Sequence, residues 1–305
     1  MAPGGPIEQR IQQMQFSGGE GSSTSGVSSE VIEALKKQYG FDKPVHTRYF
    51  IWLKNISRLD FGESFSAQEP AIDVIVSKFP VSLQFGIISL ILVYFICIPL
   101  GVIKAVKDDT WFDISSSFIL FVMYSIPPLM LGILLFVFVA GRWDLLPLGG
   151  LYSDQYHDLS AWGKIVDRVR HFIMPMICYM IGSFTVLTLL MKNSLLEEIS
   201  QDYVRTARAK GLSEKVVIFK HALKNSLIPI ATGIGSFLGV FFAGSLIIEQ
   251  IFDLDGIGLL SLESITDRDY NVIMALIFIQ SVIMLFGRLI SDILYVVIDP
   301  RIDFS

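Results

Sequence analysis

The sequence predicts an all-α membrane protein, a polytopic helical bundle with five membrane-spanning helices. Of its 305 residues, 52% are hydrophobic and only 17% are charged, whereas soluble domains contain about 25% charged residues. Five windows are long enough to cross a hydrocarbon core and contain almost no charge. The net charge of −5 argues against a nucleic-acid partner, which would need a basic surface. The predicted spans are Val81–Ile103, Ile114–Ala140, Phe172–Met191, Leu227–Ile248 and Val272–Val297.

The fifth window is the least uniform, because Arg288 and Asp292 interrupt it near its end. Residues four apart share a helix face, so these two side chains can pair. The cores of the other four spans contain no Asp, Glu, Lys or Arg. Proton and ion relays usually use intramembrane acids, so this absence argues against such a relay.

Positive charge sets the expected orientation, because cytoplasmic loops are rich in Lys and Arg. Counted over the loops and the C-terminus that follow Val81, one side of the predicted bundle carries ten of these residues and the other side carries five. The side with ten includes the loop 192–225 and the C-terminus, which we therefore expect to be cytoplasmic. The segment Glu249–Asp269 contains six acids and one Arg, and we expect it to be external.

This orientation makes residues 1–80 an external N-terminal segment, followed by a transmembrane domain of residues 81–305. No apolar stretch precedes Val81 to act as a leader. Either the segment follows the first span across the membrane, or a further span precedes Met1. We favour the second alternative and expect about twenty apolar in-frame residues upstream of Met1.

The N-terminal segment itself predicts a linker and two short helices. Ser17–Ser29 is rich in Gly and Ser, as flexible linkers are. Glu30–Tyr39 has a capping Ser29 before it and Gly40 after it. Pro44 opens an amphipathic second helix, which either lies on the external membrane surface or packs against other loops.

The loop between the third and fourth predicted spans, residues 192–225, is charged and yet patterned. Its apolar residues recur every four positions, which predicts one apolar stripe on a single helix. Gly211 is expected to end that helix, and Ser213 to cap a second helix that runs through Leu223. The stripe consists of Leu195, Ile199, Tyr203 and Ala207.

Three interpretations of this helix–turn–helix compete. A DNA-binding motif is disfavoured because both ends are tethered at the bilayer. A solvated loop needs neither an apolar stripe nor a small-residue turn. An element that docks into the groove of a cytoplasmic partner explains both features.

Two further features of the predicted spans are a pair of prolines in the second span and a row of small residues in the fourth. Pro127 and Pro128 remove backbone donors in the second span and can break it, which membranes tolerate where protein or a water-filled cavity satisfies the backbone. Gly235, Gly239 and Ala243 recur every four residues in the fourth span and allow close helix contact, either within the chain or at a subunit seam. Pro127, Pro128, Gly235 and Gly239 are therefore candidates for a path or a seam.

The motifs of an enzyme are absent from the sequence. No G-x-x-x-x-G-K-[ST] phosphate loop occurs, so the chain should not hydrolyse ATP itself. The four histidines are scattered, without the spacing of a zinc site. No G-x-S-x-G nucleophile motif occurs. We expect no catalytic residue, no metal and no cofactor.

The residues Tyr203–Gly211, followed by Phe219–Asn225 and Pro229, resemble the EAA loop of permease subunits in binding-protein-dependent ABC importers. The likeness covers essentially the whole chain and is strongest to the B-type subunit of the dipeptide, oligopeptide and nickel group. Its ending and Gly/Ser-rich insertion look most like the microcin C and oligopeptide branch. Further matching motifs are Ala2–Pro6, Tyr39–Pro44, Asp60–Ser64, Ser125–Pro127, Pro147–Gly150, Glu249, Gly256–Gly258, Arg268–Tyr270 and Asp299–Arg301.

The resemblance implies an inner-membrane pore subunit of the type I importer class for peptides or peptide-like solutes. Its partners would be a second permease subunit, two cytoplasmic ATPase subunits, an extracytoplasmic solute-binding protein and membrane lipid. The family has a span before the Pro-Gly stretch that this chain lacks, in line with the expected upstream segment. The ATPase-docking residues would be Tyr203, Arg205, Thr206, Ala207, Arg208, Ala209, Lys210 and Gly211.

Two alternatives to a pore subunit stay open on the sequence alone. A membrane scaffold or assembly protein would share the docking loop without transporting. An ion-coupled secondary carrier would transport without an ATPase, although the charge-free spans argue against it.

Overall fold

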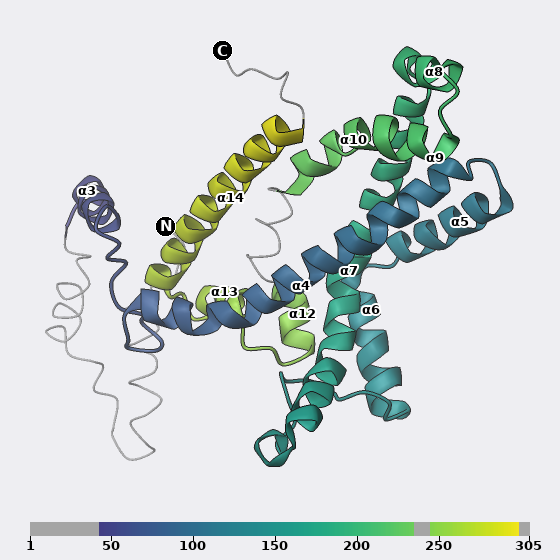
Figure 1. The fold of residues 1–305 in the computed structure, drawn as a ribbon. Helices are drawn as coiled ribbons and strands as arrows, with labels where there is room; N and C mark the ends of the chain where they lie inside the picture. Colours follow the sequence, from purple (N-terminus) through teal and green to yellow (C-terminus); the bar gives the residue numbers. More distant parts are fainter. Residues whose placement is uncertain (1–42, 235–244, 299–305) are drawn as a thin grey trace, which may run out of the picture. The chain divides into compact units, whose positions relative to one another are not determined.

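The computed structural model describes residues 43–234 and 245–298, and its regular structure is helical, as predicted (Figure 1). The chain divides into two compact units, residues 1–77 with 260–278 and residues 78–259 with 279–305. The helices are α3 (Val45–Ile56), α4 (Ala71–Val106), α5 (Trp111–Ser125), α6 (Pro128–Leu134), the π-helix η1 (Leu135–Arg142), the 3-10 helix η2 (Tyr156–Asp158), α7 (Ala161–Ile199), α8 (Asp202–Ala209), α9 (Glu214–Val216), the π-helix η3 (Val217–Ala222), α10 (Leu223–Ser226), α12 (Leu246–Ile251), α13 (Ile257–Thr266) and α14 (Tyr270–Ile298).

Within residues 43–234 and 245–298, three helices, α4, α7 and α14, are long and apolar enough to cross a membrane. They correspond to the first, third and fifth predicted spans. Two of them extend far beyond the apolar windows: α4 begins at Ala71 rather than Val81, and α7 begins at Ala161 and ends at Ile199. The windows underestimate both helices because hydropathy detects the part in hydrocarbon and not its polar extensions.

The second predicted span is not one helix. It is a pair, α5 and α6 with η1, bent by 89° at the proline pair (Figure 1). Ile126 precedes one proline and Pro127 precedes another, so steric clash pushes both residues out of the α conformation. Their ψ angles are 115° and 137°. Pro128 then occupies the first turn of α6, where a missing N–H costs nothing.

Single prolines have a different effect in this chain. Pro80 and Pro99 lie inside α4, and Pro175 lies inside α7, yet both helices continue through them. The predicted proline break therefore occurs at the Pro127–Pro128 pair, whereas the single prolines are absorbed.

The fourth predicted span is described only in part. Residues 228–234 are helical and α12 follows from Leu246, while residues 235–244 lie outside the described ranges. The predicted small-residue face of Gly235, Gly239 and Ala243 falls in that interval. In the N-terminal segment α3 confirms the helix predicted after Pro44, and the predicted helix Glu30–Tyr39 lies outside the described residues.

Helices α4 and α7 meet very closely within the second unit. A Cβ atom added to Gly101 would lie 2.6 Å from Met191 Cβ and 2.8 Å from the carbonyl oxygen of Thr188. Two apolar clusters lie along these helices, and Met191 belongs to the first of them. One joins α4 and α7 to the loop helices α8 and η3, and the other joins α4 and α7 to η1 and α12.

A buried carboxylate, Glu249, ties four segments of the second unit together. Its Oε1 accepts hydrogen bonds from Ser82 Oγ (2.9 Å), Tyr179 Oη (3.2 Å) and the N–H of Ser245 (3.2 Å). Its Oε2 accepts from the N–H of Leu259 (2.8 Å). Both oxygens are therefore satisfied, which a charge buried at 0% exposure requires.

A second buried carboxylate, Asp269, holds the first unit together. Its Oδ2 accepts from Ser64 Oγ (2.6 Å) and from both the N–H and the Oγ of Ser66 (3.2 Å each). The neighbouring Asn271 donates from Nδ2 to the carbonyl oxygen of Glu63 (2.8 Å). These bonds connect the segment before α4 to the turn that begins α14.

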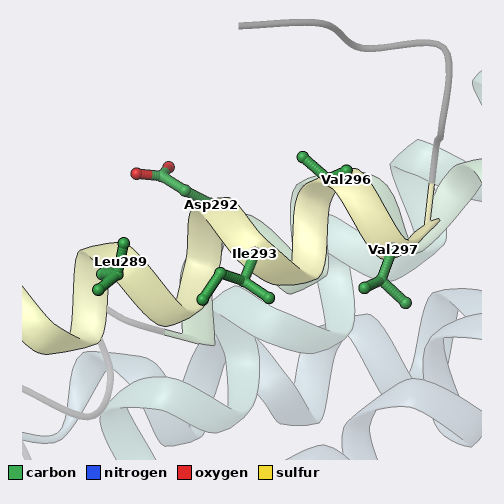
Figure 2. Close-up of a pocket in the computed structure, with 5 residues that line it drawn as sticks. All are labelled: Leu289, Asp292, Ile293, Val296 and Val297. Carbon is green, nitrogen blue, oxygen red and sulfur yellow. The ribbon is translucent and has the colours of Figure 1, made fainter.

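The C-terminal half of α14 has a shallow hollow that lies on this one helix. Figure 2 shows Asp292 projecting from the helix beside the apolar side chains of the hollow. The expected pairing of Arg288 with Asp292 is wrong: both side chains are exposed, and the ion pairs of residues 43–234 and 245–298 do not include them. The hollow is lined by Leu289, Asp292, Ile293, Val296 and Val297.

We predict that Gly101→Ala destabilises the protein, because the added methyl group overlaps the facing helix α7. The free energy of unfolding should fall by about 1–3 kcal/mol, as in other overpacked cores. Thermal unfolding in detergent measures the change. The matched control is Gly182→Ala in α7, where no atom lies within 4 Å of the new Cβ; an equal loss of stability in both variants would contradict the contact.

Candidate functional site

The first of the two helices predicted in the loop contains a break that the spacing did not reveal. α7 ends at Ile199 and α8 begins at Asp202, with Gln201 between them in an extended conformation (ψ 150°). The break shifts the register of the buried face. Leu195, Val204 and Ala207 are buried, whereas Tyr203 is 39% exposed, so its place in the predicted apolar stripe is taken by Val204.

The inner face of α8 is part of the protein core. Val204 and Ala207 join the apolar cluster that contains Val93 and Cys97 of α4 and Leu187 of α7. Val217, Ile218 and Ala222 of η3 belong to the same cluster. α8 is therefore packed onto the ends of α4 and α7 as well as being connected to α7 through the chain.

The turn after α8 has the geometry that its glycine predicts. Gly211 has φ +78°, a left-handed conformation that side chains with a Cβ disfavour, and its N–H donates to the carbonyl oxygen of Arg208 (2.9 Å). The predicted side-chain cap is wrong: Ser213 stands at the N-cap position of α9 but makes no capping hydrogen bond.

A bidentate ion pair closes the same turn. Arg208 donates from Nε to Glu214 Oε2 (3.1 Å) and from Nη2 to Oε1 (2.7 Å). Hydrogen bonding to Arg208 lowers the pKa of Glu214 below its usual value. The pair keeps α8 and α9 together, although its exposure to water limits its energy.

Tyr203 and Asn225 link the start of α8 to α10. Tyr203 Oη donates to Glu198 and accepts from Asn225 Nδ2 (3.1 Å). Partial burial, reinforced by the Glu198 carboxylate, raises the pKa of Tyr203 to about 12. The phenol therefore stays protonated at neutral pH and holds the two ends of the loop.

The outer face of α8 is open and has small and cationic groups. Arg205 extends into solvent with only a long ion pair to Asp202 (3.5 Å). Thr206, Ala209 and Lys210 are exposed beside it. Of the eight predicted docking residues, seven are exposed, and the buried Ala207 instead anchors the helix from within.

Three exposed apolar side chains extend this surface and were not predicted as part of it. Leu212 is exposed directly after the turn, Val216 ends α9, and Phe219 in η3 is 61% exposed. Exposed apolar groups grouped beside an amphipathic helix are typical of a protein-binding surface. Their signal in the sequence was three apolar residues within a charged loop.

The remaining candidate positions lie elsewhere or outside the description. Pro127 and Pro128 lie at the 89° bend between α5 and α6. Gly235 and Gly239 lie outside the described residues. Among the residues that are described, no group of three or more His, Cys, Asp or Glu side chains is placed to hold a metal ion.

Several apolar helices and the charged, partly exposed loop between α7 and α10 define a multi-pass membrane protein. The chain belongs to the family described as "Binding-protein-dependent transport system inner membrane component", whose pattern matches residues 97–304.

The chain matches several permease proteins over nearly their whole length. The chain is 43% identical to the peptidoglycan transport system permease protein YejB of Agrobacterium fabrum, with 100% of this chain and 91% of the relative covered. It is 40% identical to the inner membrane ABC transporter permease protein YejB of Escherichia coli O157:H7 (100% and 92% covered). It is 36% identical to the oligopeptide transport system permease protein AppB of Bacillus subtilis (91% and 87% covered).

The fold also matches a solved structure, the MetNI methionine ABC transporter in an inward-facing conformation. The TM-score is 0.53 at 16% sequence identity, over 72% of this chain and 96% of the other. At this identity the likeness supports the fold, which is that of an ABC importer permease.

We predict that Gly211→Val loosens the turn after α8, because a β-branched residue at φ +78° costs about 1–2 kcal/mol. Amide hydrogen exchange should speed up over residues 208–214. Gly211→Asn is the matched control, since Asn tolerates the left-handed conformation. Equal exchange in the Val variant and the parent would show that the turn does not depend on glycine.

Proposed function

We propose that this chain is the pore-forming subunit of an ATP-driven importer and that α8 with the adjoining turn docks into a cytoplasmic ATPase. The observation that carries the proposal is the two-sided loop. Its inner face shares a core with α4 and α7, whereas its outer face exposes Arg205, Thr206 and Ala209. A solvated loop would not need such packing.

The assembly we infer has four kinds of partner. A second permease subunit completes the pore, two ATPase subunits hydrolyse ATP, and an extracytoplasmic solute-binding protein delivers solute. The chain itself is not an enzyme. Family membership supports partners of these kinds in general, while the heterodimer and its stoichiometry are part of the proposal.

The proposed orientation follows the charge distribution. The loop 192–225 and the C-terminus face the cytoplasm, and residues 1–80 form an external segment before the transmembrane domain 81–305. The ten positive charges on the loop side support this arrangement.

We infer that the solutes are peptides or molecules that contain a peptide, including peptidoglycan fragments. Relatives named for oligopeptide and for peptidoglycan transport both match over most of this chain, and peptide is the chemistry that those solutes share. The bend at Pro127–Pro128 is the candidate position at the path, since broken helices in transporters border binding sites.

We predict that Ala209→Glu prevents ATPase docking, because the substitution puts a bulky negative charge on the exposed face of α8. Co-purification of the ATPase subunits should fall by at least about tenfold, the effect of losing a central interface contact. Gln201→Glu adds the same charge at the other end of α8 and should retain the ATPase. Equal recovery with both variants would contradict docking at this face.

Uptake by a deletion strain tests the solute class and the rival functions. Loss of ATP-dependent uptake of radiolabelled tri-alanine or of a labelled muropeptide supports the permease. Full uptake of both in the deletion strain would favour a scaffold. Uptake in vesicles driven by a proton gradient without ATP would favour a secondary carrier.

A further inference from the structure

An ionic cluster with a buried centre, formed by Lys104 and Asp113, lies where α4, α5 and α7 come together, apart from the proposed docking surface. Lys104 of α4 is fully buried, and its Nζ lies 2.9 Å from Asp113 Oδ1. Lys192 of α7 contacts both Asp113 Oδ2 (2.6 Å) and Asp108 Oδ1 (2.8 Å). We call these four residues the charge clamp. Asp113, in the first turn of α5, is the member that bridges both lysines.

The clamp contains many polar contacts, although Asp113 Oδ1 makes only the ion contact with Lys104 and no hydrogen bond. The Nζ of Lys104 also donates to Ser116 Oγ and Ser117 Oγ (2.7 Å each) and to the carbonyl oxygen of Asp113 (2.9 Å). Two cations and two carboxylates make the group neutral. Such a network fixes a geometry, because removing one partner leaves an opposite charge buried.

The clamp connects α5 to a rigid pair of helices. α4 and α7 touch at Gly101 and Met191, next to the two lysines in sequence. α5 is held to α7 by the clamp and, further along, by the hydrogen bond from Thr185 Oγ1 to the carbonyl oxygen of Leu120 (2.8 Å). α5 then ends at the Pro127–Pro128 bend.

α7 also leads directly into the docking helix. It continues past Lys192 to Ile199, and α8 follows after two residues. A displacement of α8 therefore reaches Lys192 through one continuous helix. The clamp is the ionic contact between this helix and α5.

We propose that Asp113 is a positioning residue that makes α5, and with it the proline bend, move together with the docking helix. This inference rests on the proposed role of the chain as an ATPase-driven permease. It adds a route from the docking surface to the broken span, through the clamp.

The deciding measurement is a distance between α5 and α7 in the complete transporter complex. Spin labels on Trp111→Cys and Ser200→Cys occupy exposed positions, whereas the native Cys97 and Cys178 are buried. The parent should give a narrow distance distribution both without nucleotide and in the vanadate-trapped state. In Asp113→Asn/Lys192→Met the distribution should broaden or shift between the states. A distribution as narrow and unshifted as the parent's would overturn the proposal.

The double variant removes one charge of each sign, so the cluster keeps its net charge. Lys104 keeps its hydrogen bonds to the carbonyl oxygen of residue 113, to Ser116 and to Ser117, and Asp108 remains partly exposed to solvent. Asp109→Asn is the matched control: Asp109 is exposed in the same turn, at φ +58°, which Asn tolerates. The control should behave as the parent does. A control that broadens as much as the double variant would overturn the specific role of Asp113.

A coupling measurement separates positioning from mere stability. In proteoliposomes, tri-alanine uptake per ATP hydrolysed should fall by about tenfold in the double variant, within the range for residues along coupled networks. Asp113→Glu, which keeps the carboxylate, should restore most of the ratio. A parallel fall of uptake and hydrolysis at constant ratio would show a structural role and overturn the proposal.

The parent complex separates failure of the permease proposal from failure of the positioning role of Asp113. A parent complex that never assembles with ATPase subunits would overturn the permease proposal and the positioning role with it. A parent that assembles and couples, alongside a double variant that couples equally well, would overturn the positioning role alone.

Discussion

The shared apolar core of α4, α7, α8 and η3 is the constraint on which the other features depend. A helix attached only by flexible ends could move without moving the spans, whereas α8 shares a buried cluster with α4 and α7 through Val204 and Ala207. Close-packed interiors transmit displacement because they are dense and hardly compressible. The outer face of the loop is exposed to solvent, while its inner face packs in the same core as α4 and α7.

The proline pair shows how local chemistry places a break at one position. Single prolines at positions 80, 99 and 175 remove one hydrogen bond each, and the surrounding helices tolerate the loss. Two consecutive prolines impose extended conformations on two consecutive residues, which no α-helix can absorb. The bend is thus determined by steric clash rather than by tertiary packing. For that reason it was visible in the sequence, while its angle was not.

The sequence predicts what depends on local chemistry or on long apolar windows. The all-α class, three of the spans and the helix end at Gly211 follow from such signals. The break at Gln201 does not, because apolar residues at 195, 199, 203 and 207 keep an unbroken period of four across it. The charge clamp was missed for another reason. Lys104, Asp113 and Lys192 flank the apolar windows, where charges are expected to meet water, and only tertiary structure brings them together in a buried network.

Two polar anchors with opposite designs hold α4 to its neighbours. Ser82 and Lys104 lie about 33 Å apart along the helix, given its rise of 1.5 Å per residue. At Ser82 a lone carboxylate, Glu249, is satisfied by neutral donors, and added Cβ atoms on Gly256 and Gly258 would lie only 2.7 and 3.0 Å from its Oε2. At Lys104 ionic partners satisfy one another. Neutral donors and closely packed glycines surround the Glu249 carboxyl group, which favours one fixed arrangement of the segments that contact it. The opposite charges on α4, α5 and α7 attract one another. In the proposed role they keep α5 with the other two helices when these helices move.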